Sequence, residues 1–294
     1  MDKQAATRIV TEFFPGAMVR DIAALAGGVS ANVYRLSLQK RDGTTANVVL
    51  REHGESHSGH PADVEFALLQ ALHEKKLAVP EPLYVDATRT KLPNPYLIMA
   101  FVKGSTDEFL HQRSQYIGAM AHLLADIHAT SSQNLPKLPI RRDPYPELLD
   151  FLPKGDDWLD VHAVMQDQIN TADPAEPKLL HGDFWPGNIL WQGQSVAAIL
   201  DWEDAALGDP LSDVACCQLE LRYKFGPESM TEFSQAYTTR HTVDQRRLNI
   251  WQVYVAAAAQ NFVGAWGLPK NQEKHIRHEA LATIREACMR LAST

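Results

Sequence analysis

Three oxygen-bearing side chains interrupt short apolar segments in the second half of the chain. Asp183 and Asn188 lie in LLHGDFWPGNILW (residues 179–191), and Asp201 directly follows the apolar residues 197–200. If the apolar residues after Asn188 pair as a hairpin with residues 197–200, Asn188 and Asp201 come to neighbouring positions at its ends. An amide oxygen and a carboxylate form an oxygen-only site of the kind that Mg²⁺ prefers. The spacing predicts a magnesium site there, with Asp183 close by and able to accept a proton from a hydroxyl group.

The composition is that of an ordinary globular protein. Of the 294 residues, 45% are hydrophobic and 22% are charged, and the length exceeds that of a typical single domain. No segment approaches the roughly 20 apolar residues that cross a membrane, and the N-terminal residues lack the long apolar region of a signal peptide. We therefore expect a cytoplasmic protein with no membrane partner. Cys216, Cys217 and Cys288 have no metal-binding spacing and are expected to be reduced, buried thiols.

The net charge of −8 is unevenly distributed along the chain. Residues 1–102 contain equal numbers of acidic and basic side chains, so residues 103–294 carry the whole negative excess. This balance argues against nucleic acid as a partner, because nucleic-acid binding needs a basic face. It suits a cationic small molecule, while a solvated acidic surface that aids solubility is the simpler interpretation. The sequence makes no prediction of the oligomeric state.

Residues 1–102 are predicted to form strands with one helix inserted. Four segments with alternating or β-branched residues are predicted strands: 32–39, 46–52, 81–87 and 96–102. The Asp42-Gly43 pair between the first two of them is typical of a hairpin turn. Residues 60–76 carry apolar side chains at the spacing of a helix that faces a core.

From Lys103 onward the spacing of the apolar residues is mostly helical. The predicted helices span 115–131, 156–171, 209–225, 242–266 and 271–291. The segments 179–191 and 195–210 interrupt them with short strands, and 132–155 has the prolines and charges of a surface connection. We therefore predict an α+β protein with a small β-rich lobe (residues 1–102) and a larger, mainly helical lobe (residues 103–294).

Two blocks of sequence carry a family resemblance. HGDFWPGN (residues 181–188), followed by ILDWEDAALGDPLSDVA (residues 199–215), resembles the aminoglycoside phosphotransferase and choline kinase-like superfamily, whose members are relatives of the protein kinases. The His-Gly-Asp triplet alone is a weak signal, and the two blocks at this spacing make a strong one. The resemblance covers roughly residues 20–215 and implies a two-lobed, protein-kinase-like fold.

The resemblance implies roles for five residues of these blocks. Asp183 would be the catalytic aspartate, and His181 would shape the loop that carries it. Asn188 and Asp201 would be the ligands of Mg²⁺. Asp213 would brace the loop from the helix that follows.

The first half of the chain matches the same family at the nucleotide site. LAGGVSANVYRL, which contains Ser30, resembles the hairpin loop that covers the nucleotide. Arg51 occupies the strand position of a phosphate-binding lysine, and Glu65 matches the glutamate of the helix that follows. Arginine is a permanent cation that can contact two phosphate oxygens, so it can serve in place of lysine. Backbone groups near Ala100 and Val102 would bind the edge of the nucleobase.

The resemblance implies a small-molecule kinase. The enzyme would move the γ-phosphoryl group of a Mg-nucleoside triphosphate, ATP or GTP, to a hydroxyl group of a small molecule. The acidic second lobe slightly favours an amino sugar or another cationic acceptor. A nucleotide-binding regulatory protein of the pseudokinase type is the alternative, and a metal-dependent hydrolase using His181 and Asp183 is weaker, because the sequence shows no further His-rich metal cluster.

Several of these side chains also have a simpler structural interpretation. Asp183 taken alone could be a turn residue bonded to its own backbone. Glu203 and Asp204 are expected to be solvated carboxylates rather than ligands. Trp185 and Trp202 are expected to be packing residues rather than platforms that stack on a ligand.

Overall fold

The computed structural model of the protein describes residues 1–25, 31–54, 59–106, 112–141, 148–169 and 175–293. The chain divides by its contacts into two units. Unit 1 consists of Met1–Glu108, Gln133–Lys137 and Ile189–Asp204, and unit 2 of Phe109–Ser132, Leu138–Asn188 and Ala205–Thr294. The lobe boundary after Val102 stays a prediction.

Unit 1 is built on a five-stranded antiparallel sheet in the order β1-β2-β3-β5-β4. Its strands are β1 (Met18–Ala24), β2 (Ala31–Gln39), β3 (Thr45–His53), β4 (Pro82–Asp86) and β5 (Tyr96–Ala100). β2 and β3 pair over their full length, and Gly43 in the turn between them has a φ of 84°, which favours glycine. The predicted hairpin is confirmed, whereas the sequence analysis did not predict β1.

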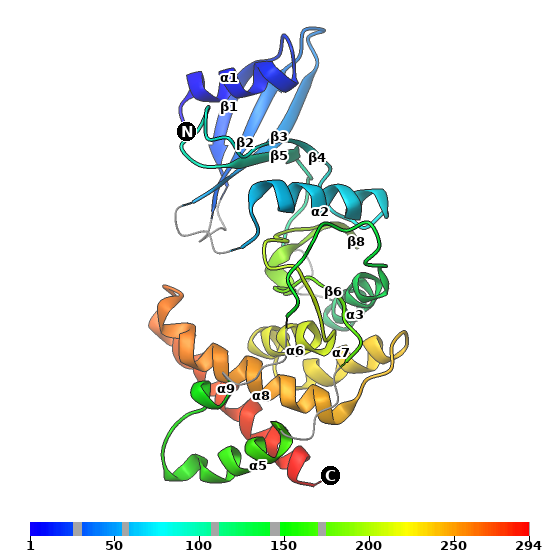
Figure 1. Cartoon of the computed structure of the whole chain (residues 1–294), viewed down its shortest axis with the longest axis vertical. Helices are drawn as coiled ribbons and strands as arrows, with labels where there is room; N and C mark the ends of the chain where they lie inside the picture. The colour runs from blue at the N-terminus through cyan, green and yellow to red at the C-terminus, as the bar shows by residue number, and fades with distance from the viewer. Residues whose placement is uncertain (26–30, 55–58, 107–111, 142–147, 170–174, 294) are drawn as a thin grey trace. The chain divides into compact units, whose positions relative to one another are not determined.

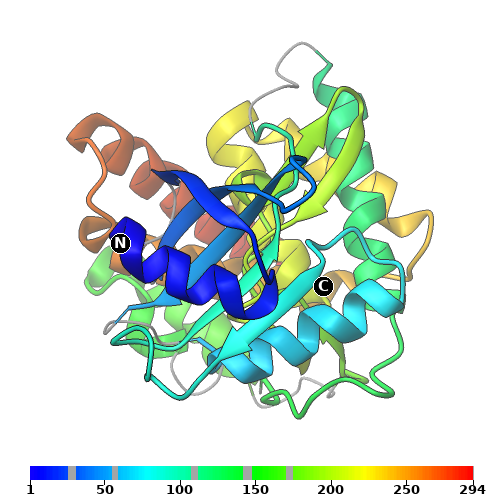
Figure 2. The same ribbon diagram turned by 90° about the horizontal axis from the view of Figure 1, so that it is seen from above.

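A helix precedes the sheet where the sequence analysis predicted only strands. α1 (Lys3–Phe13) begins after Asp2, whose side chain accepts the N–H of Ala5 at 2.7 Å. The buried side of α1 shares one core with Leu36, Leu38 and Leu50 of the sheet, and Figure 2 shows the helix crossing the strands. The prediction of a single helix in this region was wrong, because so short a helix is stabilised mainly by the sheet that it covers.

A helix and a hairpin complete unit 1. They are α2 (Ala62–Glu74), β7 (Ile189–Gln192) and β8 (Ser195–Ile199). Ile189 pairs with Ile199, so the predicted pairing of these two short strands is confirmed. Backbone bonds tie the hairpin to the rest of the unit: the N–H of Ser105 donates to Trp191 at 3.0 Å, and that of Ile199 donates to Ala78 at 2.6 Å.

Unit 2 is mainly helical. Its helices are α3 (Arg113–Ala129), α4 (Leu148–Phe151), α5 (Leu159–Ile169), α6 (Leu211–Phe225), α7 (Glu228–Thr238), α8 (Gln245–Phe262) and α9 (Lys270–Ala292), and its 3₁₀ turns are η1 (Asp156–Trp158), η2 (Pro186–Asn188) and η3 (Val263–Ala265). A core that includes Met165, Leu219, Val253 and Ile284 joins α5, α6, α8 and α9, and α8 lies along α9 in Figure 1. The predicted helices are confirmed within a few residues at each end, but α7 was not predicted. None of the described helices is long and apolar enough to cross a membrane.

A short two-stranded ladder supports the residues of chemical interest in unit 2. β6 (Lys178–Leu180) pairs antiparallel with β9 (Ala206–Gly208). Leu179 and Leu180 are fully buried, so the chain leaves β6 from a fixed, apolar base. After β9, the carboxylate of Asp209 accepts the N–H of Leu211 at 3.0 Å and starts α6.

Candidate active site

The segment His181–Asn188, which we call the polar loop, is held by Asp213 in the first turn of α6. The N–H groups of His181 and Gly182 donate to the two carboxylate oxygens of Asp213, at 2.7 and 3.1 Å. Gly182 has a φ of 87°, a conformation that other residues rarely adopt. The structure thus contains the contact between helix and loop that the resemblance implied for Asp213.

Asp213 is fully buried, and a histidine on one neighbouring helix, itself bonded to a tyrosine on another, contacts it. Nε2 of His128 on α3 lies 3.3 Å from its Oδ2, and Nδ1 of the same ring lies 2.7 Å from the hydroxyl of Tyr237 on α7. Burial acts to raise the pKa of Asp213, but hydrogen bonding to His128, and then the charges of His128, His181 and Arg141, lower it below its usual value. The polar loop is therefore anchored to three helices through one ionised carboxylate.

Asn188 orients Asp183 within the polar loop. Its Nδ2 donates to the backbone oxygen of Asp183 at 2.9 Å and to Oδ2 of the Asp183 side chain at 3.0 Å. His181 is fully buried, and its Nδ1 accepts the N–H of Asp183 at 3.3 Å. Asp183 itself is half-buried. The loop therefore fixes a carboxylate that solvent and ligands can still reach.

The two tryptophans near these residues have different surroundings. Trp202 is buried, and its Nε1 donates to the backbone oxygen of Ile199 at 3.2 Å. Trp185 is 37% exposed, and its indole lies so close to Gly187 that a Cβ there would be 2.2 Å from the ring. The packing interpretation is confirmed for Trp202, and the partly exposed indole of Trp185 packs on Gly187.

In unit 1, Arg51 on β3 contacts three carboxylates. Its Nη2 donates to Oδ1 of Asp201 at 3.0 Å and to Oε2 of Glu203, and its Nε lies 3.4 Å from Oε1 of Glu65 on α2. Burial alone would lower the pKa of Arg51, but the three carboxylates outweigh it, so the pKa is raised and the guanidinium stays charged. The structure brings together three of the residues that the sequence analysis selected, Arg51, Glu65 and Asp201.

Glu203 is not the solvated carboxylate that was expected. Its side chain is only 13% exposed and is paired with Arg51. Its backbone oxygen accepts the N–H of His60 at 2.9 Å, and the Cα of Gly59 lies against it, where a Cβ would be 2.6 Å from the Cβ of Glu203. The expectation was wrong because Arg51 is far away in the sequence, and no local pattern relates the two residues.

Asn188 in unit 2 and Asp201 in unit 1 each present a side-chain oxygen of the kind that binds Mg²⁺. Nδ2 of Asn188 is engaged by Asp183, and Oδ1 of Asp201 by Arg51. The amide oxygen of Asn188 and the second carboxylate oxygen of Asp201 have no hydrogen-bond partner among the described residues. Asp201 also has a φ of 62°, an uncommon conformation for a residue with a side chain. A neutral amide oxygen and a carboxylate are hard ligands of the kind that hold Mg²⁺ together with water and phosphate oxygens.

The remaining predicted nucleotide contacts divide into three cases. Ser30 lies outside the described residues. The N–H of Ala100 donates to the backbone oxygen of Glu81 at 2.8 Å and is engaged within the unit. Val102 lies beyond the end of β5, where no hydrogen bond of its backbone to another described residue is found.

Glu220 on α6 is a residue that the sequence analysis missed. It stands seven positions after Asp213, so the two side chains lie on one face of the helix. Burial, and then the charge of Asp183, raises the pKa of Glu220 to about 7. Glu220 makes no hydrogen bond or ion pair with another described residue. The polar loop therefore has a second carboxyl group in its electrostatic reach. The helical spacing from Asp213 is the one signal that points to it in the sequence.

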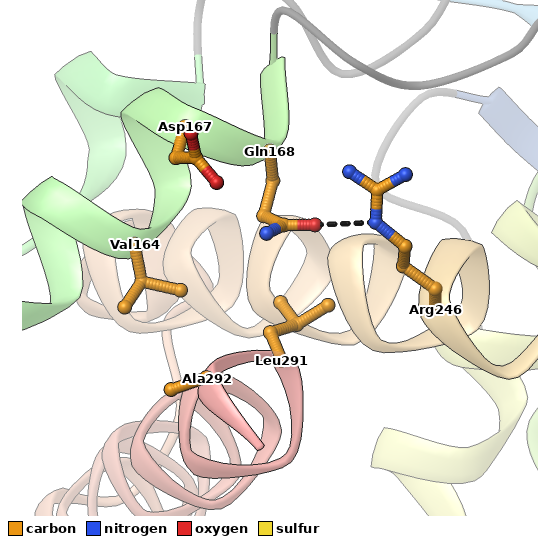
Figure 3. A pocket seen from close by; sticks show the side chains of 6 residues that line it. All are labelled: Val164, Asp167, Gln168, Arg246, Leu291 and Ala292. Carbon is orange, nitrogen blue, oxygen red and sulfur yellow. Dashed lines mark hydrogen bonds between the residues drawn. The ribbon is translucent and has the colours of Figure 1, made fainter. Parts of the chain in front are cut away.

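The thiols are not poised for reaction, and a hollow of unit 2 lies away from the polar loop. The three cysteines are free, and burial raises the pKa of Cys216 and Cys217 well above the usual value, as expected for unreactive thiols. A hollow of about 430 Å³ is lined by Val164, Asp167, Gln168, Arg246, Leu291 and Ala292. Figure 3 shows the hydrogen bond of 2.6 Å from Nε of Arg246 to Gln168 on one side of it. None of the predicted site residues lines this hollow.

Comparison with known sequences assigns most of the chain to one family model. The model of the "Phosphotransferase enzyme family" matches residues 21–251. The chain is 25% identical over 189 residues to acyl-CoA dehydrogenase family member 10 of Mus musculus, covering 54% of this chain and 16% of that protein. It is 25% identical over 202 residues to family member 11 of Pongo abelii, covering 60% of this chain and 25% of that protein. The chain thus spans only about a sixth to a quarter of the length of the curated relatives it matches.

Solved structures share the fold over nearly the whole chain. A thermostable mutant of aminoglycoside phosphotransferase APH(4)-Ia with ADP and hygromycin B has a TM-score of 0.64 at 17% identity, covering 96% of this chain and 98% of that one. The GDP complex of a mutant aminoglycoside 2′-phosphotransferase-IIIa has a TM-score of 0.65 at 16% identity, covering 98% of each chain. A choline/ethanolamine kinase family protein of Mesorhizobium loti has a TM-score of 0.64 at 18% identity, covering 100% of this chain and 96% of that one. These likenesses confirm the predicted kinase-like α+β fold, and at such identities they show the fold alone.

Proposed function

The chain belongs to the phosphotransferase enzyme family, and we propose that it transfers the γ-phosphoryl group of a Mg-nucleoside triphosphate to a hydroxyl group of a small molecule. The family model supports the sequence-based assignment as a phosphotransferase. One observation carries the proposal for this chain. Asn188 holds the accessible carboxylate of Asp183 on a loop fixed by a buried, ionised Asp213.

Asp183 would orient the acceptor hydroxyl and take its proton. The hydroxyl oxygen forms a bond to the γ-phosphorus, the bond from that phosphorus to the β–γ bridging oxygen breaks, and the nucleoside diphosphate leaves with the electron pair. The proton of the hydroxyl passes to the carboxylate of Asp183. Because such transfer is loose and dominated by charge, positioning and electrostatics supply most of the acceleration.

Arg51, Asn188 and Asp201 would hold the donor. The guanidinium of Arg51 would bind phosphate oxygens, which requires it to exchange its contacts with Asp201 and Glu203 for phosphate. Asn188 and Asp201 would hold Mg²⁺ through the oxygens that have no partner among the described residues. When bound, Mg²⁺ screens the negative charge of the phosphates. ATP and GTP are both proposed donors, since relatives of this fold were solved with ADP and with GDP.

A cationic acceptor, such as an amino sugar, is slightly favoured. The net charge of −8 lies in residues 103–294, and Glu220 lies within electrostatic reach of Asp183. One relative of this fold was solved with hygromycin B. The curated relatives carry acyl-CoA dehydrogenase names, so an acyl-linked hydroxyl belongs in the same acceptor screen.

Substitution of Asp183 by Asn tests the proposal. Phosphate transfer is measured with ATP and with GTP against amino sugars, choline, homoserine, sugars and hydroxyacyl thioesters. We expect turnover to fall on the order of 10³-fold in D183N, while nucleotide affinity, read from a thermal-shift titration, is kept. The control is D150N, since Asp150 is exposed on the short helix α4. Equal rates in D183N and the wild type contradict the assignment, and nucleotide binding without turnover on any acceptor supports the regulatory alternative.

A further inference from the structure

His53 shares Glu65 with Arg51. Both side chains leave β3 two residues apart and therefore on the same face of the strand. Nε2 of His53 lies 2.9 Å from Oε2 of Glu65, and Nε of Arg51 lies 3.4 Å from Oε1 of the same carboxylate. All three side chains are buried, with exposed fractions of 5%, 3% and 9% for His53, Glu65 and Arg51. His53 and Arg51 thus approach different oxygens of the Glu65 carboxylate.

The two contacts with Glu65 differ in kind. Nε of Arg51 is buried and has no hydrogen-bond partner among the residues that the structure describes, so its approach to Glu65 is an attraction between charges without a hydrogen bond. The contact with His53 has the length of a good hydrogen bond. An ionised carboxylate can only accept, so the Nε2 of His53 carries the proton that it donates. His53 therefore donates a hydrogen bond that holds Oε2 of Glu65 in place.

The surroundings of Arg51 make that direction important. Nη2 of Arg51 is held by Asp201 and Glu203, and both contacts must give way when phosphate binds. Glu65 remains beside the guanidinium, because it approaches Nε and not Nη2. A buried carboxylate that loses a donor turns toward other donors or takes up a proton, and in either case it attracts Arg51 less.

We propose that His53 is a positioning residue of the nucleotide site: by donating its Nε2 hydrogen to Glu65, it holds that carboxylate against the Arg51 guanidinium that binds the triphosphate. The inference rests on the proposed function, since it assigns a task to Arg51 that only a nucleotide site requires. His53 touches neither substrate nor the reacting atoms in this scheme. Its effect therefore belongs to nucleotide binding and not to the transfer step.

Three substitutions of His53 separate hydrogen-bond donation from packing. The side-chain amide nitrogen of Gln reaches the position of Nε2, whereas that of Asn reaches only the position of Nδ1, and Leu has no donor. We expect H53N and H53L to raise the KM for the Mg-nucleotide about 10-fold, as loss of a hydrogen bond to a buried charge implies, with kcat within about 3-fold of the wild type. We expect H53Q to restore the KM. H73L is the matched control, since His73 is exposed near the end of α2.

Each outcome decides a separate question. A KM raised in H53N and H53L and restored in H53Q supports the inference, because Leu fills the buried position about as well as Gln but has no donor. An unchanged KM in all three variants, or an equal rise in H53Q and H53N, overturns it. If H53L does not fold, H53M decides in its place, because Met has the length of Gln and no hydrogen-bond donor. A wild-type protein that binds neither Mg-ATP nor Mg-GTP overturns the proposed function instead, so the two failures are distinguishable.

Discussion

Glu220, a half-buried carboxyl group on α6, can make the free energy of unfolding depend on pH. Burial first, and the charge of Asp183 second, raise its pKa from the usual 4.5 to about 7. The folded protein therefore holds a proton between these two values that the unfolded chain has released. This contribution to stability is present in full below the unfolded pKa, and it is lost as the pH rises through the folded pKa.

Substitution of Glu220 by Gln removes this titration. We expect the free energy of unfolding of the wild type to fall by about 3 kcal/mol relative to E220Q between about pH 4 and pH 8, as a shift of this size implies. Urea unfolding of both proteins across that range measures the difference. The control is E228Q, since Glu228 is exposed on α7. Parallel pH profiles for the wild type and E220Q would show that Glu220 has an ordinary pKa.

The side-chain contacts that the residues alone predict are those between neighbours in the chain, whereas Arg51, Glu65 and Asp201 were selected through the family resemblance. Asp183 and Asn188 share one loop, and the contact between their side chains follows from that spacing. The pairing of Arg51 with Glu203 joins residues 152 positions apart, and no periodicity or motif in the sequence connects them. Glu220 is intermediate, because its helical spacing from Asp213 places it on the right face while its burial depends on tertiary packing.

At the scale of elements, the segment before α2 contacts the loop after β8 closely at Gly59. A Cβ on Gly59 would lie 2.6 Å from the Cβ of Glu203 and 2.7 Å from its backbone oxygen. The backbone oxygen cannot move aside as a flexible side chain can. The same oxygen also accepts the N–H of His60 at 2.9 Å. The segment before α2 and the loop that carries Asp201 and Glu203 can therefore pack closely only where residue 59 has no side chain.

Substitution of Gly59 by Ala is expected to separate these two segments. We expect a loss of about 1–3 kcal/mol in the free energy of unfolding, as overpacking of a close contact implies, and a higher KM for the nucleotide, because Glu203 shifts relative to Arg51. Urea unfolding and steady-state kinetics measure the two effects. G118A is the matched control, because Gly118 lies in α3 with nothing within 4 Å of a Cβ, and there we expect a neutral or slightly stabilising change. A G59A protein that behaves like G118A contradicts this account.

The elements that sequence patterns identify are those that repeat a period over enough residues. The alternation of β2 and β3 and the apolar spacing of α2, α6 and α9 gave bounds within a few residues of those observed. In α1 the buried Ala5, Ala6, Ile9 and Val10 recur at helical spacing, a signal that was left unused, whereas the three-residue strands β6 and β9 are too short for periodicity to be informative. They form because a sheet or a partner strand covers them, and that context is not written in their own residues.

At the scale of the whole molecule, each unit has a core of its own. The core of unit 1 joins α1 to the sheet and includes Leu50, which is fully buried. The core of unit 2 joins α5, α6, α8 and α9 and includes Ile284, which is also fully buried. Separate cores allow separate openings, since a local opening exposes only the contacts of the unit that opens.

The independence of the two cores is tested with one cavity in each. We expect L50A and I284A each to lose about 2–5 kcal/mol in the free energy of unfolding of the unit that holds the cavity. Hydrogen exchange read by mass spectrometry should show lost protection in β2, β3 and β5 for L50A, with α8 and α9 still protected. I284A should show the reverse pattern, because its cavity removes contacts of α8 and α9 while leaving the sheet intact. If either variant loses protection equally in both units, the chain opens as one cooperative body, and the separate cores do not act separately.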